Sequence, residues 1–112
     1  MDNELKELGH KIGKVPRIFR ELEKTDPDLF NLMMKLDQMV WDDGALSRKT
    51  KKLIAIAIAA ALRDQHAIKA QMQGAHALGV TKDEVEEALR VAFLLAGMPA
   101  YVNGKAIEED LM

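Results

Sequence analysis

The chain has 112 residues, with 16 basic and 18 acidic side chains and a formal net charge of −2. This length fits one domain, and 48% hydrophobic residues are enough to fill its core, so a disordered protein is excluded. The balanced charge disfavours a dedicated nucleic-acid binder. The chain has no cysteine, which excludes disulfides, thiolate metal sites and thiol catalysis. We therefore expect a single domain over residues 1–112 without a nucleic-acid partner.

No segment has the pattern of a membrane span or an export signal. The longest uninterrupted apolar run, Leu53 to Leu62, is about half as long as a membrane-spanning helix needs to be. The first residues, MDNELKELGHK, lack a basic segment followed by an apolar stretch. We expect a cytoplasmic protein with no membrane partner.

Apolar residues recur at helical spacing rather than in strict alternation, which predicts an all-α fold of about five to six helices. A first helix is predicted over 2–12, and a short second one follows Pro16. Asp26 is expected to cap the third helix, with Pro27 at its first position and its end near Trp41.

The middle of the chain predicts two more helices. Ser47 is a suitable cap for a helix that runs to Leu62 and is apolar on all sides in its second half. Such a helix is buried either in the centre of the domain or against other subunits. The next helix is predicted over 64–78, and Gly79 is expected to end it in the left-handed conformation.

The last third of the chain predicts a capped helix, a break and a final amphipathic segment. Thr81 and Glu84 have the spacing of a capping box, which opens a helix to about Ala96. The sequence at 97–99, Gly-Met-Pro, breaks that helix, and the amphipathic segment 101–111 follows. Together these elements predict a compact helical bundle.

The segment from Gly44 to Gly104 resembles the carboxymuconolactone decarboxylase and alkyl hydroperoxidase D-like family. Three stretches carry the resemblance in the same order along the chain: LSRKTKKLIAIAIA, AHALGVTKDEVEEAL and AFLLAGMPA. The resemblance implies an all-α bundle of the alkyl hydroperoxidase D-like type. It also implies a homo-oligomer, a trimer or a hexamer, in which the long apolar helices form much of the shared interface.

The residues at the motif positions also indicate which branch of the family the chain resembles. The redox branch carries a Cys-x-x-Cys pair, whose positions fall on Asp64 and Ala67, and an accompanying His and Glu, whose positions fall on Gln71 and Lys52. A peroxidase of this type needs both thiols, so redox activity is excluded. The decarboxylase branch lacks the pair and carries Gly-x-Pro-Ala, which residues 97–100 match. This branch usually keeps a His where Gln71 stands, and glutamine hydrogen-bonds but transfers no proton.

The resemblance and the residue chemistry together nominate a site. Asp64 and Gln71 are the candidate catalytic residues: Asp64 would orient or protonate a small carboxylated ligand, and Gln71 would hydrogen-bond it. Lys52, Arg63 and Ala67 are candidate substrate-binding residues, and either basic side chain would offset the charge of the ligand. Each also has a structural interpretation, as a first-turn acid for Asp64, a polar subunit contact for Gln71 and a lysine that reaches water for Lys52.

Other conspicuous residues are interpreted as structural. His66 and His76 lie on the opposite face of their helix and lack the spacing of a helical metal pair, so no metal site is predicted. Trp41 is expected to anchor the core or an interface. Gly74 costs about 1 kcal/mol in the middle of a helix, which indicates close approach of another helix or a ligand.

Two functions remain open from the sequence. The first is a cofactor-independent, decarboxylase-like lyase that acts on or binds a small carboxylated metabolite in a pocket shared between subunits. The alternative is a catalytically silent oligomeric binding or scaffold protein. No cofactor is expected in either case. The two differ in whether Asp64 and Gln71 line a pocket that is connected to solvent.

Overall fold

The computed structural model describes residues 17–112. Within this range the chain forms six helices and no strand, which confirms the predicted all-α fold. The helix predicted over 2–12 lies outside the described residues. The helices are α2 (Arg17–Thr25), α3 (Pro27–Trp41), α4 (Arg48–Leu62), α5 (Gln65–Ala77), α6 (Lys82–Ala96) and α7 (Met98–Leu111).

The helix starts that were predicted from capping residues are confirmed. An Asp26 carboxylate oxygen accepts the Leu29 N–H at 3.1 Å, and Pro27 occupies the first turn of α3. The Ser47 hydroxyl accepts the Thr50 N–H at 3.1 Å at the start of α4. These bonds satisfy backbone donors that have no partner inside the helix.

The predicted capping box is also found, whereas the break before the last helix is shorter than the predicted 97–99, because α7 begins at Met98 and not at residue 101. At the start of α6 the Thr81 hydroxyl accepts the Glu84 N–H at 3.2 Å, and Glu84 in turn accepts the Thr81 N–H at 2.8 Å. The helix ends at Gly97, where φ is 90°. Pro99 then lies in the first turn of α7, where a missing N–H costs nothing.

Two helix ends share one hydrogen-bond pattern. Gly79 ends α5 in the left-handed region at φ 79°, as predicted, and Arg63 ends α4 in the same region at φ 56°. In both cases the next residue donates its N–H to a carbonyl five positions back, the Schellman pattern. Arginine rarely adopts this conformation, so the residue type at position 63 does not predict that α4 ends there.

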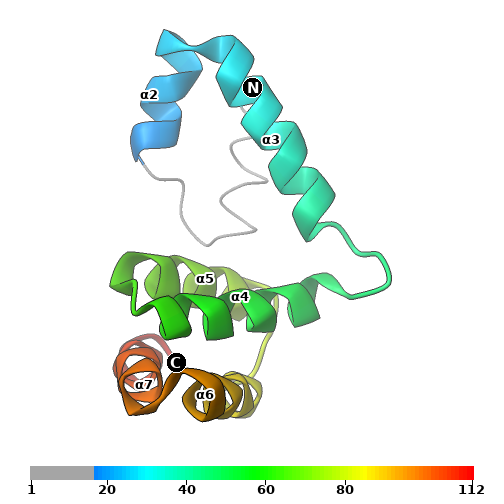
Figure 1. Cartoon of the computed structure of the whole chain (residues 1–112). Helices are drawn as coiled ribbons and strands as arrows, with labels where there is room; N and C mark the ends of the chain where they lie inside the picture. Colours follow the sequence, from blue (N-terminus) through cyan, green and yellow to red (C-terminus); the bar gives the residue numbers. More distant parts are fainter. Residues whose placement is uncertain (1–16) are drawn as a thin grey trace.

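The six helices form a four-helix body and a two-helix arm (Figure 1). In the body, α4 packs against α5, α6 and α7. The arm consists of α2 and α3, which pack on each other and rise away from the body. Each part has its own apolar cluster. The cluster of the body includes Ile56, Ile68, Met72, Val85 and Leu89, and that of the arm is formed by Phe30 and Met34 with Phe19 and Leu22 packed against them.

The apolar half of α4 is buried on one face only. Ile56, Ala59 and Ala60 lie in the core of the body, whereas Ile54 and Ile58 on the outer face are 42% and 55% exposed. Burial within the domain therefore accounts for the inner face alone. Cover of the outer face by another subunit, the second alternative from the sequence, stays a prediction. No helix among residues 17–112 combines the length and apolar character needed to cross a membrane.

Candidate functional site

The side chains of Lys52 and Gln71 meet between α4 and α5, where Gln71 is half-buried. Lys52 is completely buried, so the expectation that its side chain reaches water is wrong. Its Nζ donates to Gln71 Oε1 at 3.0 Å and lies 3.8 Å from the centroid of the Trp41 ring. The fold thus brings together Lys52, a candidate substrate-binding residue, Gln71, a candidate catalytic residue, and Trp41, the only tryptophan of the chain.

The two contacts explain how an ammonium can be kept in this position. Burial of a charge is costly unless hydrogen bonds and nearby charges or dipoles replace water. The amide oxygen of Gln71 supplies a hydrogen bond, and the face of the Trp41 ring attracts a cation through its quadrupole. Neither group adds a proton-transfer function, so they orient the ammonium of Lys52.

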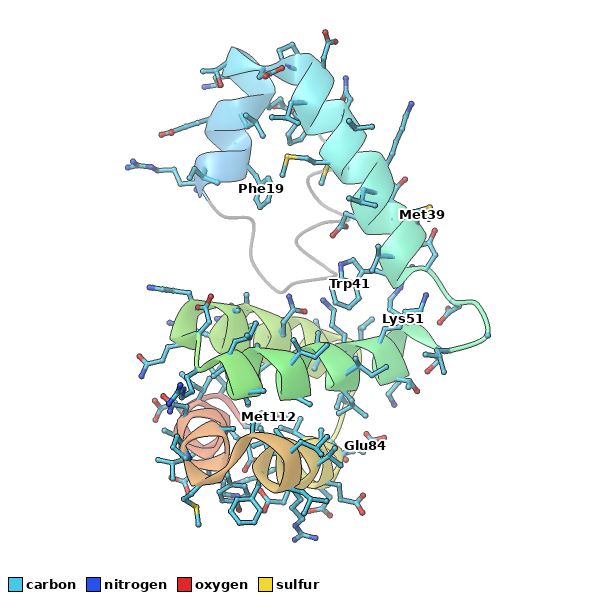
Figure 2. The ribbon with its side chains drawn as sticks, viewed as in Figure 1. Phe19, Met39, Trp41, Lys51, Glu84 and Met112 are labelled. Carbon is cyan, nitrogen blue, oxygen red and sulfur yellow. The ribbon has the colours of Figure 1, made fainter. Side chains whose placement is uncertain are left out.

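An apolar groove extends from Trp41 over the arm and the outer face of α4. It consists of a hollow of about 270 Å³ between α2 and α3 and one of about 320 Å³ between α3 and α4. The two hollows share Val40 and Trp41. Figure 2 shows Phe19 and Trp41 on the side of the arm that faces the body. The apolar side chains of the groove are Phe19, Met33, Met34, Leu36, Val40, Trp41, Ile54, Ala55 and Ile58.

Arg63 and Asp64 form the turn between α4 and α5, and Ala67 lies in the first turn of α5. Asp64 is exposed, and its Oδ1 accepts the Ala67 N–H at 3.1 Å, so it caps α5. Ala67 contributes this backbone donor and is half-buried, whereas Arg63 is exposed in the left-handed turn. The structure therefore groups four of the five candidate residues into two contacts, the cap of α5 and the pair of Lys52 with Gln71. Neither Asp64 nor Gln71 lines the groove.

The two histidines of α5 lie as the helical face analysis predicts, whereas Gln73 on the same face is half-buried. His66 and His76 are exposed, and Gly74 is buried. Within residues 17–112, no three His, Cys, Asp or Glu side chains are grouped so that they could hold a metal ion.

A second polar cluster joins α6 to α7, and sequence analysis missed it. Tyr101 OH donates to Glu86 Oε1 at 2.5 Å, and Lys105 Nζ donates to Glu86 Oε2 at 3.0 Å. Lys105 Nζ also donates at 2.9 Å to Glu108 Oε1, whose side chain is fully buried. The spacing of Lys105 and Glu108 predicts a pair within one helix, but the contact of Lys105 with Glu86 depends on how α6 and α7 are aligned.

The hydrogen bonds of this cluster shift the acidity of its members. The hydrogen bond from Tyr101 lowers the pKa of Glu86, and Lys105 lowers it further. The same bond raises the pKa of Tyr101. Hydrogen bonds to Glu108 and then to Glu86 raise the pKa of Lys105. The cluster therefore favours ionised carboxylate and ammonium groups, which fasten α6 to α7.

Comparison with known proteins identifies the family of this chain. The model of the carboxymuconolactone decarboxylase family matches residues 27–109, a wider segment than the 44–104 that the motifs predict. An uncharacterized protein of Methanocaldococcus jannaschii is 44% identical over 86 residues, which cover 76% of this chain and 83% of that protein. The 4-carboxymuconolactone decarboxylase of Acinetobacter baylyi is 36% identical over 94 residues, with 83% and 69% coverage.

Two crystal structures share the fold. A carboxymuconolactone decarboxylase family protein from Legionella pneumophila superposes with a TM-score of 0.79 at 28% identity and covers 94% of both chains. A candidate carboxymuconolactone decarboxylase from Burkholderia xenovorans LB400 has a TM-score of 0.83 at 19% identity, with 98% of this chain and 86% of that chain covered. The second likeness concerns the fold alone.

Proposed function

Because the chain belongs to the carboxymuconolactone decarboxylase family, we propose that it binds and decarboxylates a small carboxylated metabolite without a cofactor. The observation that carries the proposal is the buried Lys52 ammonium, which is held by Gln71 and by Trp41, a residue that also lines the apolar groove. With no cysteine in the chain, thiol chemistry is excluded. We place this activity in a cytoplasmic homo-oligomer.

The proposed site divides the ligand into a charged and an apolar part. The ammonium of Lys52 attracts the carboxylate, Gln71 hydrogen-bonds it through its amide N–H, and the groove beside Trp41 accepts the carbon skeleton. Sites for small molecules commonly combine an apolar lining with a few polar groups in this way. The similarity to the Acinetobacter baylyi 4-carboxymuconolactone decarboxylase supports a carboxylated lactone as the first substrate to test.

The reaction requires charge stabilisation and one proton. When the bond between the carboxylate and the skeleton breaks, CO₂ leaves and its electron pair remains on the lactone. A nearby ammonium stabilises this negative charge in a water-poor site. A proton must then be returned to carbon. We assign that step to the Lys52 ammonium, because Asp64, the other candidate acid, caps α5 at the opposite end of α4, about 18 Å along the helix axis from Lys52.

Binding without turnover is the second candidate function. It is favoured by the exposure of Asp64 and by the use of its Oδ1 as the cap of α5. It is also favoured by Gln71, which cannot transfer a proton. In that case Lys52 and the groove would still hold a carboxylated ligand.

A decarboxylation assay with a carboxylated muconolactone tests the proposal. Asparagine caps helices as well as aspartate does, so Asp64→Asn removes the carboxyl group and keeps the cap of α5. Loss of turnover in this variant would therefore show that the carboxyl group takes part in the reaction. Lys52→Met should abolish both binding and turnover. Lys69→Met, on the exposed face of α5, is the matched control and should leave both unchanged.

Fluorescence of Trp41, the only tryptophan, reports binding separately because Lys52 lies against its ring. A fluorescence change that Lys52→Met removes, without turnover in the wild type, selects the binding function. Turnover that Asp64→Asn leaves intact shows that the proton has another source. No binding of the lactone and no turnover would reject the site for this substrate class.

A further inference from the structure

Part of the polar cluster between α6 and α7 lines a hollow that is separate from the apolar groove. The two helices pack side by side (Figure 1), and the hollow between them, here called the α6–α7 hollow, has a volume of about 350 Å³. The residues that line it are Glu86, Arg90, Phe93, Met98 and Tyr101. It shares no lining residue with the groove. Its size is that of a site for a small molecule.

The apolar side of the hollow is a corner made of two aromatic rings. The centroids of Phe93 and Tyr101 lie 6.3 Å apart, and the ring planes are at 80° to each other. The hydrogen bond from Tyr101 OH to Glu86 Oε1 fixes the position of its ring. Phe93 and Met98 are 42% and 56% exposed, so a ligand can reach the corner from solvent. Two rings at right angles contact a flat ligand through the face of one ring and the edge of the other, which favours an aromatic ligand over a saturated one.

Arg90 adds a cation to the rim of the hollow. Its Nε lies 3.6 Å from Glu86 Oε1, a distance too long for a hydrogen bond, and this is the one ion pair of Arg90 among residues 17–112. The guanidinium nitrogens can therefore donate to a ligand. The carboxylate of Glu86 does not compete for them, because its two oxygens already accept from Tyr101 and Lys105. A guanidinium binds a carboxylate through two parallel hydrogen bonds, so the charge of the hollow favours an anion.

We propose that the α6–α7 hollow binds a small aromatic carboxylate, whose ring packs in the corner of Phe93 and Tyr101 and whose carboxylate pairs with Arg90. The two ammonium groups and two carboxylates of the cluster below it would leave Arg90 as the group that selects the charge of the ligand. The inference does not rest on the proposed function, because the hollow and the groove have no residue in common.

An NMR titration of the full chain with benzoate tests the site, because the chain has one tyrosine and one tryptophan. The ring signals of Tyr101 report the hollow, and the indole N–H signal of Trp41 reports the groove. We expect benzoate to shift the Tyr101 signals in a saturable manner. We also expect any shift of the Trp41 signal to be the same in Arg90→Gln as in the natural chain. No shift of the Tyr101 signals at millimolar benzoate, or a shift of Trp41 alone, would overturn the inference.

Two variants test the charge and the aromatic wall separately. Arg90→Gln should weaken the binding of benzoate at Tyr101 about ten-fold, because it removes charge-assisted hydrogen bonds. Arg20→Gln makes the same change at an exposed arginine of α2 and should leave the binding unchanged. Phe93→Leu keeps an apolar side chain without a ring and should remove the preference for an aromatic ligand. Equal effects of Arg90→Gln and Arg20→Gln would contradict the proposal.

A comparison of ligands gives a test that requires no variant to fold. Benzamide has the ring without the charge, and cyclohexanecarboxylate has the charge without the flat ring. Each should bind about ten-fold more weakly than benzoate to the natural chain when the Tyr101 signals are followed. Equal binding of benzamide and benzoate would show that Arg90 does not select an anion, and equal binding of cyclohexanecarboxylate would show that the aromatic corner does not select a ring. Either result would reject the assigned ligand class.

Discussion

Gly104 of α7 lies directly against the side chain of Leu89 of α6. A Cβ atom added at Gly104 would overlap Leu89 Cδ2 and would come within 3.2 Å of Cδ1. Leu89 is fully buried in the core of the body, so its side chain has little room to move away. The missing side chain at Gly104 therefore allows the close approach of α6 and α7 that the polar cluster of Glu86 and Tyr101 requires.

We predict that Gly104→Ala lowers the free energy of unfolding by about 1 kcal/mol in urea titrations. Overpacking costs about 1–3 kcal/mol, which exceeds the gain of about 1 kcal/mol in helix propensity. In a Leu89→Ala background the same change should be neutral or stabilising, because the clash is removed. Gly44→Ala is the control, since nothing lies within 4 Å of a Cβ there. Equal costs in both backgrounds would show that Leu89 is not the cause.

Arg63 provides a second prediction, on the end of α4. A non-glycine residue in the left-handed region costs about 1–2 kcal/mol, partly offset by the greater freedom of glycine in the unfolded chain. Arg63→Gly should therefore raise the free energy of unfolding by about 0.5–1 kcal/mol in thermal or urea denaturation. Gly79→Ala, at φ 79° in the equivalent position of α5, should lower it by a similar amount. A stability loss in Arg63→Gly would mean that the side chain makes a stabilising contact.

Glu86 and Tyr101 provide a prediction on pH. The pKa of Glu86 in the folded chain lies below its value of 4.5 in the unfolded chain, mainly because Tyr101 donates a hydrogen bond to it. A lowered pKa contributes stability above pH 4.5, and this contribution is lost as the pH falls through the folded value. In Tyr101→Phe, carboxyl NMR titration should show the pKa of Glu86 rising, and less stability should be lost on acidification.

Glu84 is the internal control for that titration. Its pKa is lowered by the backbone and side chain of Thr81 and should not move in Tyr101→Phe. An unchanged pKa of Glu86 in this variant would show that Lys105 and Arg90, and not Tyr101, keep the carboxylate ionised.

Sequence reasoning succeeded where the deciding interactions are local. Asp26, Ser47 and the pair of Thr81 and Glu84 cap their helices through bonds that span three residues, so residue type and spacing are sufficient to predict them. Gly79 was equally predictable, because glycine is the residue that the left-handed helix end favours.

The interactions that the sequence did not predict depend on how helices pack. Lys52 looked like a surface lysine because its burial requires Gln71 from α5 and Trp41 from the arm. The contact of Glu86 with Tyr101 likewise requires a particular alignment of α6 and α7. The distance between two helices is set by side-chain packing, which periodicity alone does not reveal.

The buried pair of Lys52 and Gln71 provides the last prediction, a double-mutant cycle. Gln71→Leu removes an acceptor at 3.0 Å from a fully buried ammonium, so it should cost about 2 kcal/mol of unfolding free energy, as hydrogen bonds to charged groups do. In a Lys52→Met background the ammonium is absent, and Gln71→Leu should then be nearly neutral. The coupling between the two positions should therefore be close to the whole cost of the single change.

Gln73→Leu is the matched control for this cycle, because Gln73 is half-buried on the same helix. Its effect in urea titrations should be the same with Lys52 or Met at position 52. A cost of Gln71→Leu that persists in the Lys52→Met background would mean that the amide stabilises the helix through another contact. Full coupling would instead show that Gln71 holds the ammonium of Lys52, which is the arrangement that the proposed binding of a carboxylate requires.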